Sequence, residues 1–322
     1  MKLTLAHEHS LPTGVLGLAI TPDGGRAFAA CVDGAIYAME TDAGKTETFE
    51  EKHTSFANGC VLLPDGHTVI SAGYDGALLW HDVESGRSTR RVQAHKFWNW
   101  QLALSRDGRK LATTTGQYLP GGWKYEPAAE TEASVKLFDT ANGQLIGSFG
   151  HTPPVLSCAF TNDGTYAAAA NMMGEVRVWE IAGGSKPVSH WTSPDFTSWG
   201  TVKTHHYCGG IYGLAFSPDD DALICCGMGP MNDPMAGNGK MTWQRWNWRK
   251  GERVDQIKDG ERGSGLMEAL AWHPEGKFFV MAGRQAQGSW NLAVFSAVDG
   301  SLLHSIDTKK RITQARFTKD GQ

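Results

Sequence analysis

The residues best suited to chemistry form two short clusters that do not combine into one site. His205, His206 and Cys208 stand close together in the sequence, and His7 and His9 form a second group. Structural zinc is usually held by four ligands that come as two spaced pairs, and neither cluster has a second pair at a suitable distance. We therefore expect no metal site, and no motif indicates a cofactor.

The cysteines show no spacing typical of a disulfide framework. All of them except Cys208 lie inside apolar, strand-like runs: Cys31, Cys60, Cys158, Cys225 and Cys226. Neighbouring residues of a strand point to opposite faces, so the last two cannot share a metal ion. Buried free thiols fit a reducing compartment, and the apolar run at residues 3–6 is too short for a secretory signal. We expect a cytoplasmic protein.

Charge and hydropathy bound the classes of partner. The net charge is −4 at pH 7 and the chain has no run of Lys or Arg, whereas proteins that bind a phosphate backbone present basic surfaces. No stretch approaches the roughly 18 consecutive apolar residues of a membrane-spanning helix. We therefore expect neither nucleic acid nor a membrane as the partner.

A tight turn of the form Pro-Asp-Gly recurs along the whole chain. Its acidic residues are separated by 42, 42, 56, 56, 56 and 45 residues. The seven copies are Pro22-Asp23-Gly24, Pro64-Asp65-Gly66, Arg106-Asp107-Gly108, Asn162-Asp163-Gly164, Pro218-Asp219-Asp220, Pro274-Glu275-Gly276 and Lys319-Asp320-Gly321. Proline presets φ, aspartate bonds to its own backbone and glycine accepts a positive φ. Such a recurrence predicts a repeat architecture.

Short apolar strands are expected around each turn. Those before the turns are Val15 to Ile20, Ala57 to Leu62, Asn99 to Leu104, Val155 to Phe160, Ile211 to Phe216, Met267 to Trp272 and Ile312 to Phe317. A second strand follows the turn, a third ends near a large residue such as Trp80 or Trp179, and a more polar fourth follows a glycine turn. Four antiparallel strands in about 42 residues make one propeller blade.

These repeats resemble the WD40-repeat (G-beta-like) β-propeller family, in a degenerate form of bacterial type. The resemblance covers essentially the whole chain and implies an all-β fold, a seven-bladed WD40-type β-propeller whose seventh blade is incomplete in this chain. We expect a single domain over residues 1–322, with blades near 11–50, 53–93, 95–149, 151–192, 205–258 and 264–307. Residues 308–322 and 2–7 contribute to a closing seventh blade. Two strands of that blade are missing, so we expect the natural chain to continue for roughly 20 residues past Gln322.

The polar set typical of the resembled family is complete in no repeat. His53, Ser71 and Asp75 are present in the second repeat, but His81 stands where the family has tryptophan. We therefore expect the blades to depend more on apolar packing and less on a buried polar network.

Three tryptophans alternate along one expected strand. Trp246 matches the tryptophan position of the family and is expected in the core. A period of two sends Trp243 to the same side as Trp246 and Trp248 only if the strand contains a bulge, and the sequence leaves this open.

The insertions all fall on one face of the expected propeller. The interval from turn aspartate to the next glycine turn is 21 residues in the short repeats but 36 from Asp107 to Gly143. The long loops are rich in aromatic residues and methionine, which anchor protein partners. The alternative is that these side chains pack on one another as a lid. The candidate partner-binding residues are Trp98, Tyr118, Trp123, Tyr125, Phe196, Trp199, His206, Met231 and Trp290.

The leading hypothesis is a non-catalytic scaffold that binds a protein or peptide through this face. Glu268 and Arg316 are the only ionisable residues on the seven expected inner strands apart from the cysteines and Tyr212, and Glu268 is expected to have no partner there. Such a channel lacks the paired groups that acid–base catalysis requires. The alternative is a propeller enzyme or cofactor-binding propeller with its site in the long loops. The residues considered for that site are His205, His206, Trp123 and Asp233.

Overall fold

The structure is built almost entirely from antiparallel β-strands. The computed structural model describes residues 2–117, 129–196, 209–230, 239–257 and 263–321. Within these ranges it has 24 strands and a short 3-10 helix, η1 (Pro194–Phe196). No helix in this part of the chain is long and apolar enough to cross a membrane.

The strands form four-stranded units that follow one another along the chain, each a simple meander. The first unit contains β1 (Val15–Ile20), β2 (Arg26–Cys31), β3 (Ile36–Glu40) and β4 (Thr46–Thr48). The second contains β5 (Ala57–Leu62), β6 (Thr68–Gly73), β7 (Ala77–Asp82) and β8 (Ser88–Gln93). The third contains β9 (Gln101–Leu104), β10 (Lys110–Thr114), β11 (Val135–Asp139) and β12 (Leu145–Phe149).

The second half of the chain repeats this plan. The fourth unit contains β13 (Val155–Phe160), β14 (Tyr166–Asn171), β15 (Glu175–Glu180) and β16 (Ser189–Thr192). The fifth contains β17 (Ile211–Phe216), β18 (Leu223–Met228), β19 (Gly239–Asn247) and β20 (Glu252–Gln256). The sixth contains β21 (Ser264–Trp272), β22 (Phe278–Gln287), β23 (Leu292–Ser296) and β24 (Leu302–Ile306). Pairing between the start of β19 and the start of β21 joins the last two units into one eight-stranded sheet.

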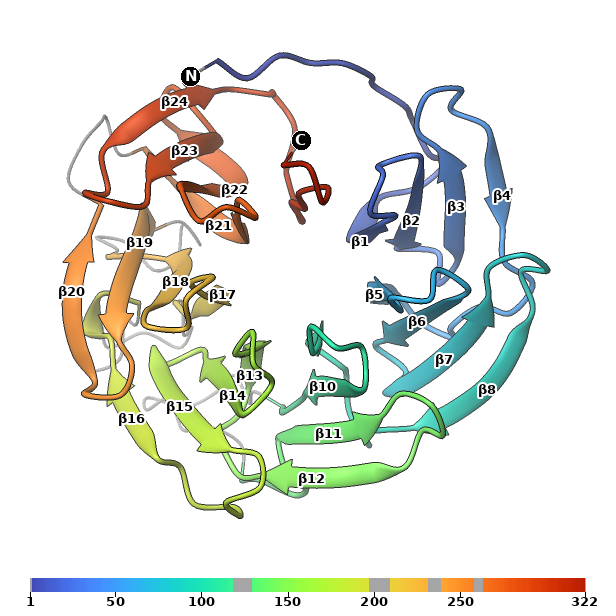
Figure 1. Cartoon of the computed structure of the whole chain (residues 1–322), viewed down its shortest axis with the longest axis horizontal. Coiled ribbons are helices and arrows are strands. Elements are labelled where there is room, and N and C mark those ends of the chain that lie inside the picture. Colours follow the sequence, from blue (N-terminus) through green and yellow to red (C-terminus); the bar gives the residue numbers. More distant parts are fainter. Residues whose placement is uncertain (1, 118–128, 197–208, 231–238, 258–262, 322) are drawn as a thin grey trace, which may run out of the picture.

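The units are arranged in a circle around a central opening (Figure 1), with the first strand of each unit innermost and the fourth outermost. The inner units are therefore covered on both faces by neighbouring sheets. This explains why most residues of the second strands are buried, as in β18, where all six are buried. Apolar clusters fill the spaces between neighbouring units, for example around Trp179, Trp246 and Phe279. The five cysteines in the described ranges are free and buried, as predicted.

The two terminal segments lie between the sixth and first units (Figure 1). Residues 312–317 were expected to form an inner strand and residues 2–7 an outer one, but the structure assigns no strand to either segment. A strand requires a hydrogen-bonded neighbour, and these segments make only isolated bonds to the units on each side. Ile312 N donates to Gly283 O at 3.1 Å, and Thr313 Oγ1 donates to Val15 O at 3.0 Å.

Two tryptophans of β19 and Trp248, which directly follows the strand, settle the question that the sequence left open. Trp246 and Trp248 pack in the cluster between the fourth and fifth units, whereas Trp243 packs in the cluster between the fifth and sixth. Trp246 is buried in the core, as predicted. The strand therefore keeps its period of two between the two faces, and because both faces are covered, all three side chains are buried.

The recurrent turn has the expected geometry, with one informative exception. The glycine after the acidic residue has a positive φ in the other copies, such as 74° at Gly24 and 73° at Gly108, and in the fifth copy Asp220 adopts the same conformation at 62°. Its carboxylate accepts bonds from Asn162 N at 2.7 Å, Asn162 Nδ2 at 2.7 Å and Asp163 N at 3.1 Å. Asp220 thus tolerates an unfavourable φ while it links the fourth unit to the fifth.

Substitutions at Asp220 should separate these two contributions. Asp220→Ala removes the bonds and keeps the positive φ, so we expect it to lower the free energy of unfolding by about 2 to 3 kcal/mol. Asp220→Gly also removes the bonds, but glycine adopts a positive φ without strain. The free energy of unfolding should therefore fall by about 1 kcal/mol less than in the alanine variant. Urea denaturation of both variants measures the difference. An alanine variant as stable as the glycine variant would show that φ is not strained at this turn.

Candidate functional site

Five aromatic residues form one connected group, here called the aromatic patch: Phe56, Tyr74, Phe97, Trp98 and Trp100. Phe56 directly precedes β5, Tyr74 lies in the turn between β6 and β7, and the other three lie between β8 and β9. The rings of Tyr74 and Trp98 are stacked at 4.6 Å, and Phe97 stacks on Trp98 at 5.0 Å. Phe56 packs against Tyr74 at 5.7 Å. The loops between strands that the sequence predicts on one face of the propeller therefore contribute to a single aromatic group.

The patch combines exposed rings with a fixed backbone. Phe56 is 44% exposed and Trp98 41% exposed. Tyr74 N donates to Phe56 O at 2.8 Å, and Thr115 Oγ1 donates to Trp98 O at 2.8 Å. Trp100 Nε1 donates to Gly116 O at 2.9 Å. Exposed aromatic rings that are held in place before binding lose little entropy when a partner covers them.

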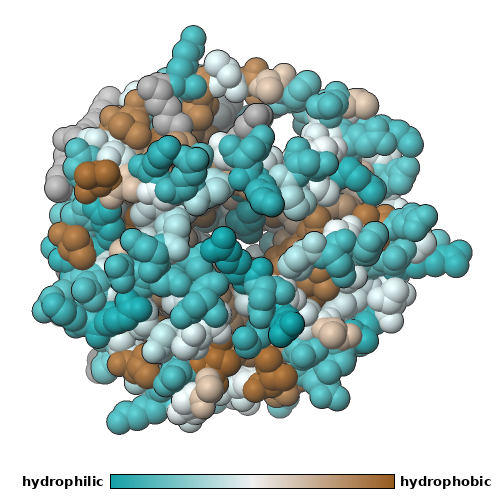
Figure 2. Space-filling model, in the orientation of Figure 1, coloured by the Kyte–Doolittle hydropathy of each residue, from teal (hydrophilic) through white to brown (hydrophobic). Residues whose placement is uncertain are grey.

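The other exposed large apolar side chains of the described chain are scattered. They are Leu5, Leu145, Ile146, Val188, Val254, Val298 and Leu303, most of them on or beside outer strands. Figure 2 shows the face turned to the viewer in Figure 1, and this face is mostly hydrophilic, with apolar residues in separate small groups. Single exposed apolar residues are normal on soluble proteins. The connected aromatic patch is therefore the unusual apolar feature of the described surface.

The turn that carries Tyr74 requires glycine. Gly76 has φ of 73°, and a Cβ at this position would lie 2.3 Å from His95 O. Asp75 Oδ1 accepts a bond from Ala77 N at 3.1 Å and closes the turn. A side chain at Gly76 would therefore displace the segment that leads to Trp98.

A buried polar network lies directly beneath this turn. His53 Nδ1 is bonded to Asp75 Oδ1 at 2.9 Å, and His53 Nε2 to Ser71 Oγ at 2.9 Å. Ser71 Oγ is bonded in turn to His81 Nε2 at 2.9 Å, so Ser71 donates to one histidine and accepts from the other. The sequence predicts less dependence on a polar network, but in this unit the network is present, because His81 presents a ring nitrogen where the family has the indole of tryptophan.

The order Asp75, His53, Ser71 is that of a nucleophilic triad, but its surroundings exclude that role. The side chain of His53 is fully buried, Ser71 is 0% exposed, and neither residue lines the central cavity. A catalytic serine must reach a substrate carbonyl beside an oxyanion site. The network therefore stabilises the fold and orients the turn that carries Tyr74.

An ion pair stands beside the patch at the central opening. Arg311 Nε donates to Glu268 Oε2 at 2.7 Å and its NH2 group donates to Oε1 at 2.5 Å. The bond to Glu268 raises the pKa of Arg311, and Tyr74 is close enough for its phenol to contribute. Burial raises the pKa of Tyr74. The prediction that Glu268 has no partner is wrong, because Arg311 comes from the segment after β24, outside the seven expected inner strands.

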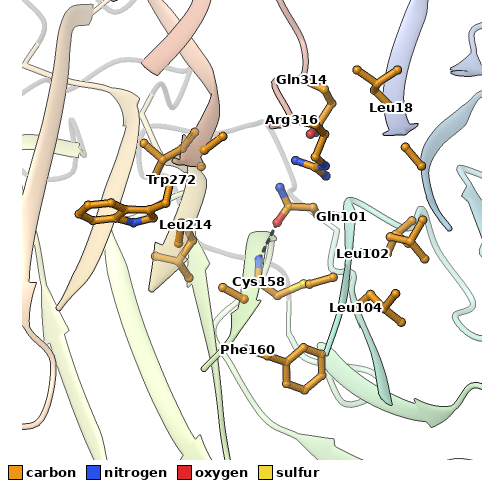
Figure 3. Close-up of a pocket in the computed structure, with 18 of the residues that line it drawn as sticks. Leu18, Gln101, Leu102, Leu104, Cys158, Phe160, Leu214, Trp272, Gln314 and Arg316 are labelled. Carbon is orange, nitrogen blue, oxygen red and sulfur yellow. Dashed lines mark hydrogen bonds between the residues drawn. The ribbon is translucent and has the colours of Figure 1, made fainter. Parts of the chain in front are cut away.

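The central opening encloses a cavity of about 530 Å³ that the inner strands line, here called the channel (Figure 3). Most of its lining residues are apolar, with Leu18, Leu102, Phe160 and Leu214 among them, but polar and apolar atoms contribute about equally to its surface. Figure 3 shows Arg316 and Gln101 pointing toward one another inside it. The channel therefore combines apolar side chains with a polar region of similar extent.

The structure places the predicted partner-binding residues differently from one another. Trp98 is exposed within the aromatic patch. Phe196 and Trp290 are 0% and 2% exposed and belong to the clusters on either side of the fifth unit, so they cannot contact a partner in this structure. Their loops return to the core, which buries the apolar rings at these points. Tyr118, Trp123, Tyr125, Trp199, His206 and Met231 lie outside the described residues.

Sequence reasoning missed Phe56, Tyr74 and Trp100. A positional signal was present for the first, because Phe56 and Trp98 both stand nine residues before a turn aspartate, Asp65 and Asp107. Equivalent positions of neighbouring repeats lie side by side in a circular array. A comparison of repeats column by column would have joined the two exposed rings.

Within the described ranges, no group of three or more His, Cys, Asp and Glu side chains is arranged to hold a metal ion. The residues considered for a site in the long loops, His205, His206, Trp123 and Asp233, lie outside those ranges.

Comparison with known proteins identifies the repeat. The family model described as "WD domain, G-beta repeat" matches residues 143–180 and 198–229. The chain contains repeats of the WD40 family. The first WD40 match runs from the outer strand β12 through β15, so the sequence repeat begins on one four-stranded unit and ends on the next.

A curated relative is similar to part of this chain. It is the SAGA complex/transcription factor TFIID complex subunit Taf5 of Schizosaccharomyces pombe, 34% identical over 80 residues. The aligned residues are 24% of this chain and 12% of that protein, so this chain matches only a small part of its length.

Proposed function

We propose that this protein is a non-catalytic WD40 β-propeller that binds a protein or peptide partner through the face bearing the aromatic patch. The observation that carries the proposal is the stack of Phe56, Tyr74 and Trp98, which is contiguous, partly exposed and fixed by its own backbone bonds. Aromatic side chains of this kind dominate the affinity of protein interfaces. The similar segment belongs to Taf5, whose name describes it as a subunit of the SAGA and TFIID complexes. That name is consistent with an interaction module.

The architecture we propose has seven blade positions in one domain. The six four-stranded units are blades one to six, and the position between β21 and β1 belongs to a seventh, to which residues 308–321 and 2–7 contribute. The first WD40 match begins on the outer strand of one unit and ends on the next unit. A sequence repeat that spans two blades in this way leaves an outer strand at the start of the chain, which can close the ring, and this supports the proposed arrangement.

The proposed partner is a polypeptide and not nucleic acid or a membrane, since the net charge of −4 offers no basic surface. The proposed compartment is the cytoplasm. Burial raises the pKa of the Cys60, Cys158 and Cys225 thiols to about 12, which keeps them protonated and unreactive as a reducing compartment permits.

Peptides selected from a random display library on the purified protein provide the test. The double variant Phe56→Ala, Trp98→Ala should weaken binding of the selected peptides by about 30-fold or more, because two anchor rings are lost. The matched control is Leu145→Ala, Ile146→Ala, which removes two exposed apolar side chains from the outer strand β12. Peptides that bind the Phe56, Trp98 variant as tightly as the wild type would refute the assignment of this surface.

A further inference from the structure

The channel contains a positive charge that no described side chain neutralises. Its ionisable lining residues are Glu268, Arg316 and two cysteines. Glu268 is bonded to Arg311 through both carboxylate oxygens. Burial raises the pKa of Cys60 and Cys158 to about 12, so both thiols are neutral. Arg316 forms no ion pair in the described chain and donates one hydrogen bond, to Ala315 O at 3.0 Å.

Arg316 is exposed to the channel, yet protein surrounds the channel on its sides. This environment lowers the pKa of Arg316, but a guanidinium remains charged at any pH at which the protein is folded. A charge that faces a cavity enclosed by protein attracts a counter-ion more strongly than the same charge on an open surface, because the surrounding protein reduces screening by solvent.

A second donor faces the same space. Gln101 Oε1 accepts a bond from Cys158 N at 2.7 Å, and this bond directs the amide nitrogen toward Arg316 (Figure 3). The same nitrogen reaches Tyr212 O at 3.4 Å, so the side chain from β9 is held by strands of two other units. Two donor groups therefore face each other across the channel, and an acceptor placed between them would satisfy both.

We propose that the channel binds a small organic anion that carries one carboxylate and an apolar body. The single arginine matches the single charge of a carboxylate, and its planar fork suits the two oxygens. A phosphate dianion would need a second cation, and Arg316 is the only Lys or Arg among the described residues that line the channel. Leu18, Leu102 and Leu214 offer apolar contacts, and a volume of about 530 Å³ lies in the range of small-molecule sites.

Calorimetric titration with 3-phenylpropionate tests the proposal, with neutral 3-phenylpropanamide as the matched ligand. The acid should bind about 10-fold or more tightly than the amide, and Arg316→Gln should weaken binding of the acid by a similar factor. Arg87→Gln is the control variant, because Arg87 is exposed and pairs with Glu50 away from the channel. Arg316→Gln loses no ion pair and should melt at the wild-type temperature.

Two further arms define the chemistry. One arm uses a short peptide with a free C-terminal carboxylate. If this peptide binds through Arg316 and the free acid does not, the ligand group is still a carboxylate, but its source is a polypeptide. Inorganic phosphate that binds more tightly than the acid, equal binding of acid and amide, or full binding by Arg316→Gln would each overturn the proposal. Arg316 lies outside the aromatic patch, so this test is independent of the proposed partner-binding face.

Discussion

Replacing Asp75 with alanine is expected to lower the free energy of unfolding by about 3 to 5 kcal/mol, because it removes one partner of a buried charged network. The Asp75 side chain is 7% exposed and accepts bonds from His53, from Thr54 N at 3.0 Å and from Arg91 NH2 at 3.1 Å. Burial raises the pKa of Asp75, but the bonds and charge of His53 outweigh it and hold the pKa well below its usual value. The alanine variant leaves these donors without an acceptor.

Asp33 provides a matched control for this substitution. It occupies the same turn in the first unit and accepts a bond from Ala35 N at 3.1 Å, as Asp75 does from Ala77 N at 3.1 Å. Its other partners are Tyr37 OH, which donates at 2.8 Å, and Lys52 Nζ at 3.9 Å, and no described histidine completes a network there. Asp33→Ala should cost about 1 to 2 kcal/mol in urea denaturation. Equal losses at the two positions would show that the His53 network adds nothing to stability.

The strands near the turns could be predicted because their signals are local. Val15–Ile20 and Ala57–Leu62 have the same bounds in the structure as in the prediction, since a short apolar run followed by a Pro-Asp-Gly turn specifies a hairpin without distant information. Residues 312–317 have a similar pattern but no strand. Their conformation depends on a hydrogen-bonded neighbour, which a local pattern cannot supply.

The candidate site could be predicted only in part, because it depends on contacts between distant segments. Trp98 was identified by its residue type and its position in a connection. Phe196 and Trp290 have the same character in sequence, but their rings turn into the core. The pair Glu268 and Arg311 joins residues 43 apart, and only the circular arrangement brings them together. Residue type therefore indicates an aromatic face, and the packing decides which rings remain exposed.

The polar network shows how one substitution misled the sequence reasoning. His81 was interpreted as the loss of a tryptophan, which predicts a weaker network. In the structure its ring nitrogen bonds Ser71 at 2.9 Å, and its ring packs on Phe49 at 5.2 Å. An imidazole can thus replace an indole as donor, but unlike an indole it can also take up a proton.

Protonation of buried histidines should make the protein sensitive to mild acid. Burial lowers the pKa of His81 to about 4, with a smaller contribution from the charge of His53, and burial lowers the pKa of His151 to about 4. The unfolded chain takes up these protons near pH 6.5, before the folded protein does. The stability that each histidine contributes is complete above pH 6.5 and is lost as the pH falls toward 4, by about 2 kcal/mol each at pH 5.

Urea denaturation at pH 7.5 and pH 5.0 measures this loss in a window above the range in which carboxylates titrate in the unfolded chain. The wild type should lose at least about 4 kcal/mol between the two, because burial also lowers the pKa of His95, and His151→Gln, which cannot take up a proton, should lose about 2 kcal/mol less. His190→Gln is the control, because His190 is exposed on β16 and should leave the full loss in place. A wild-type loss below about 1 kcal/mol would contradict the assignment. Such a result would mean that these rings take up protons as easily in the folded protein as in the unfolded chain. The interfaces between neighbouring sheets would then have to open near neutral pH.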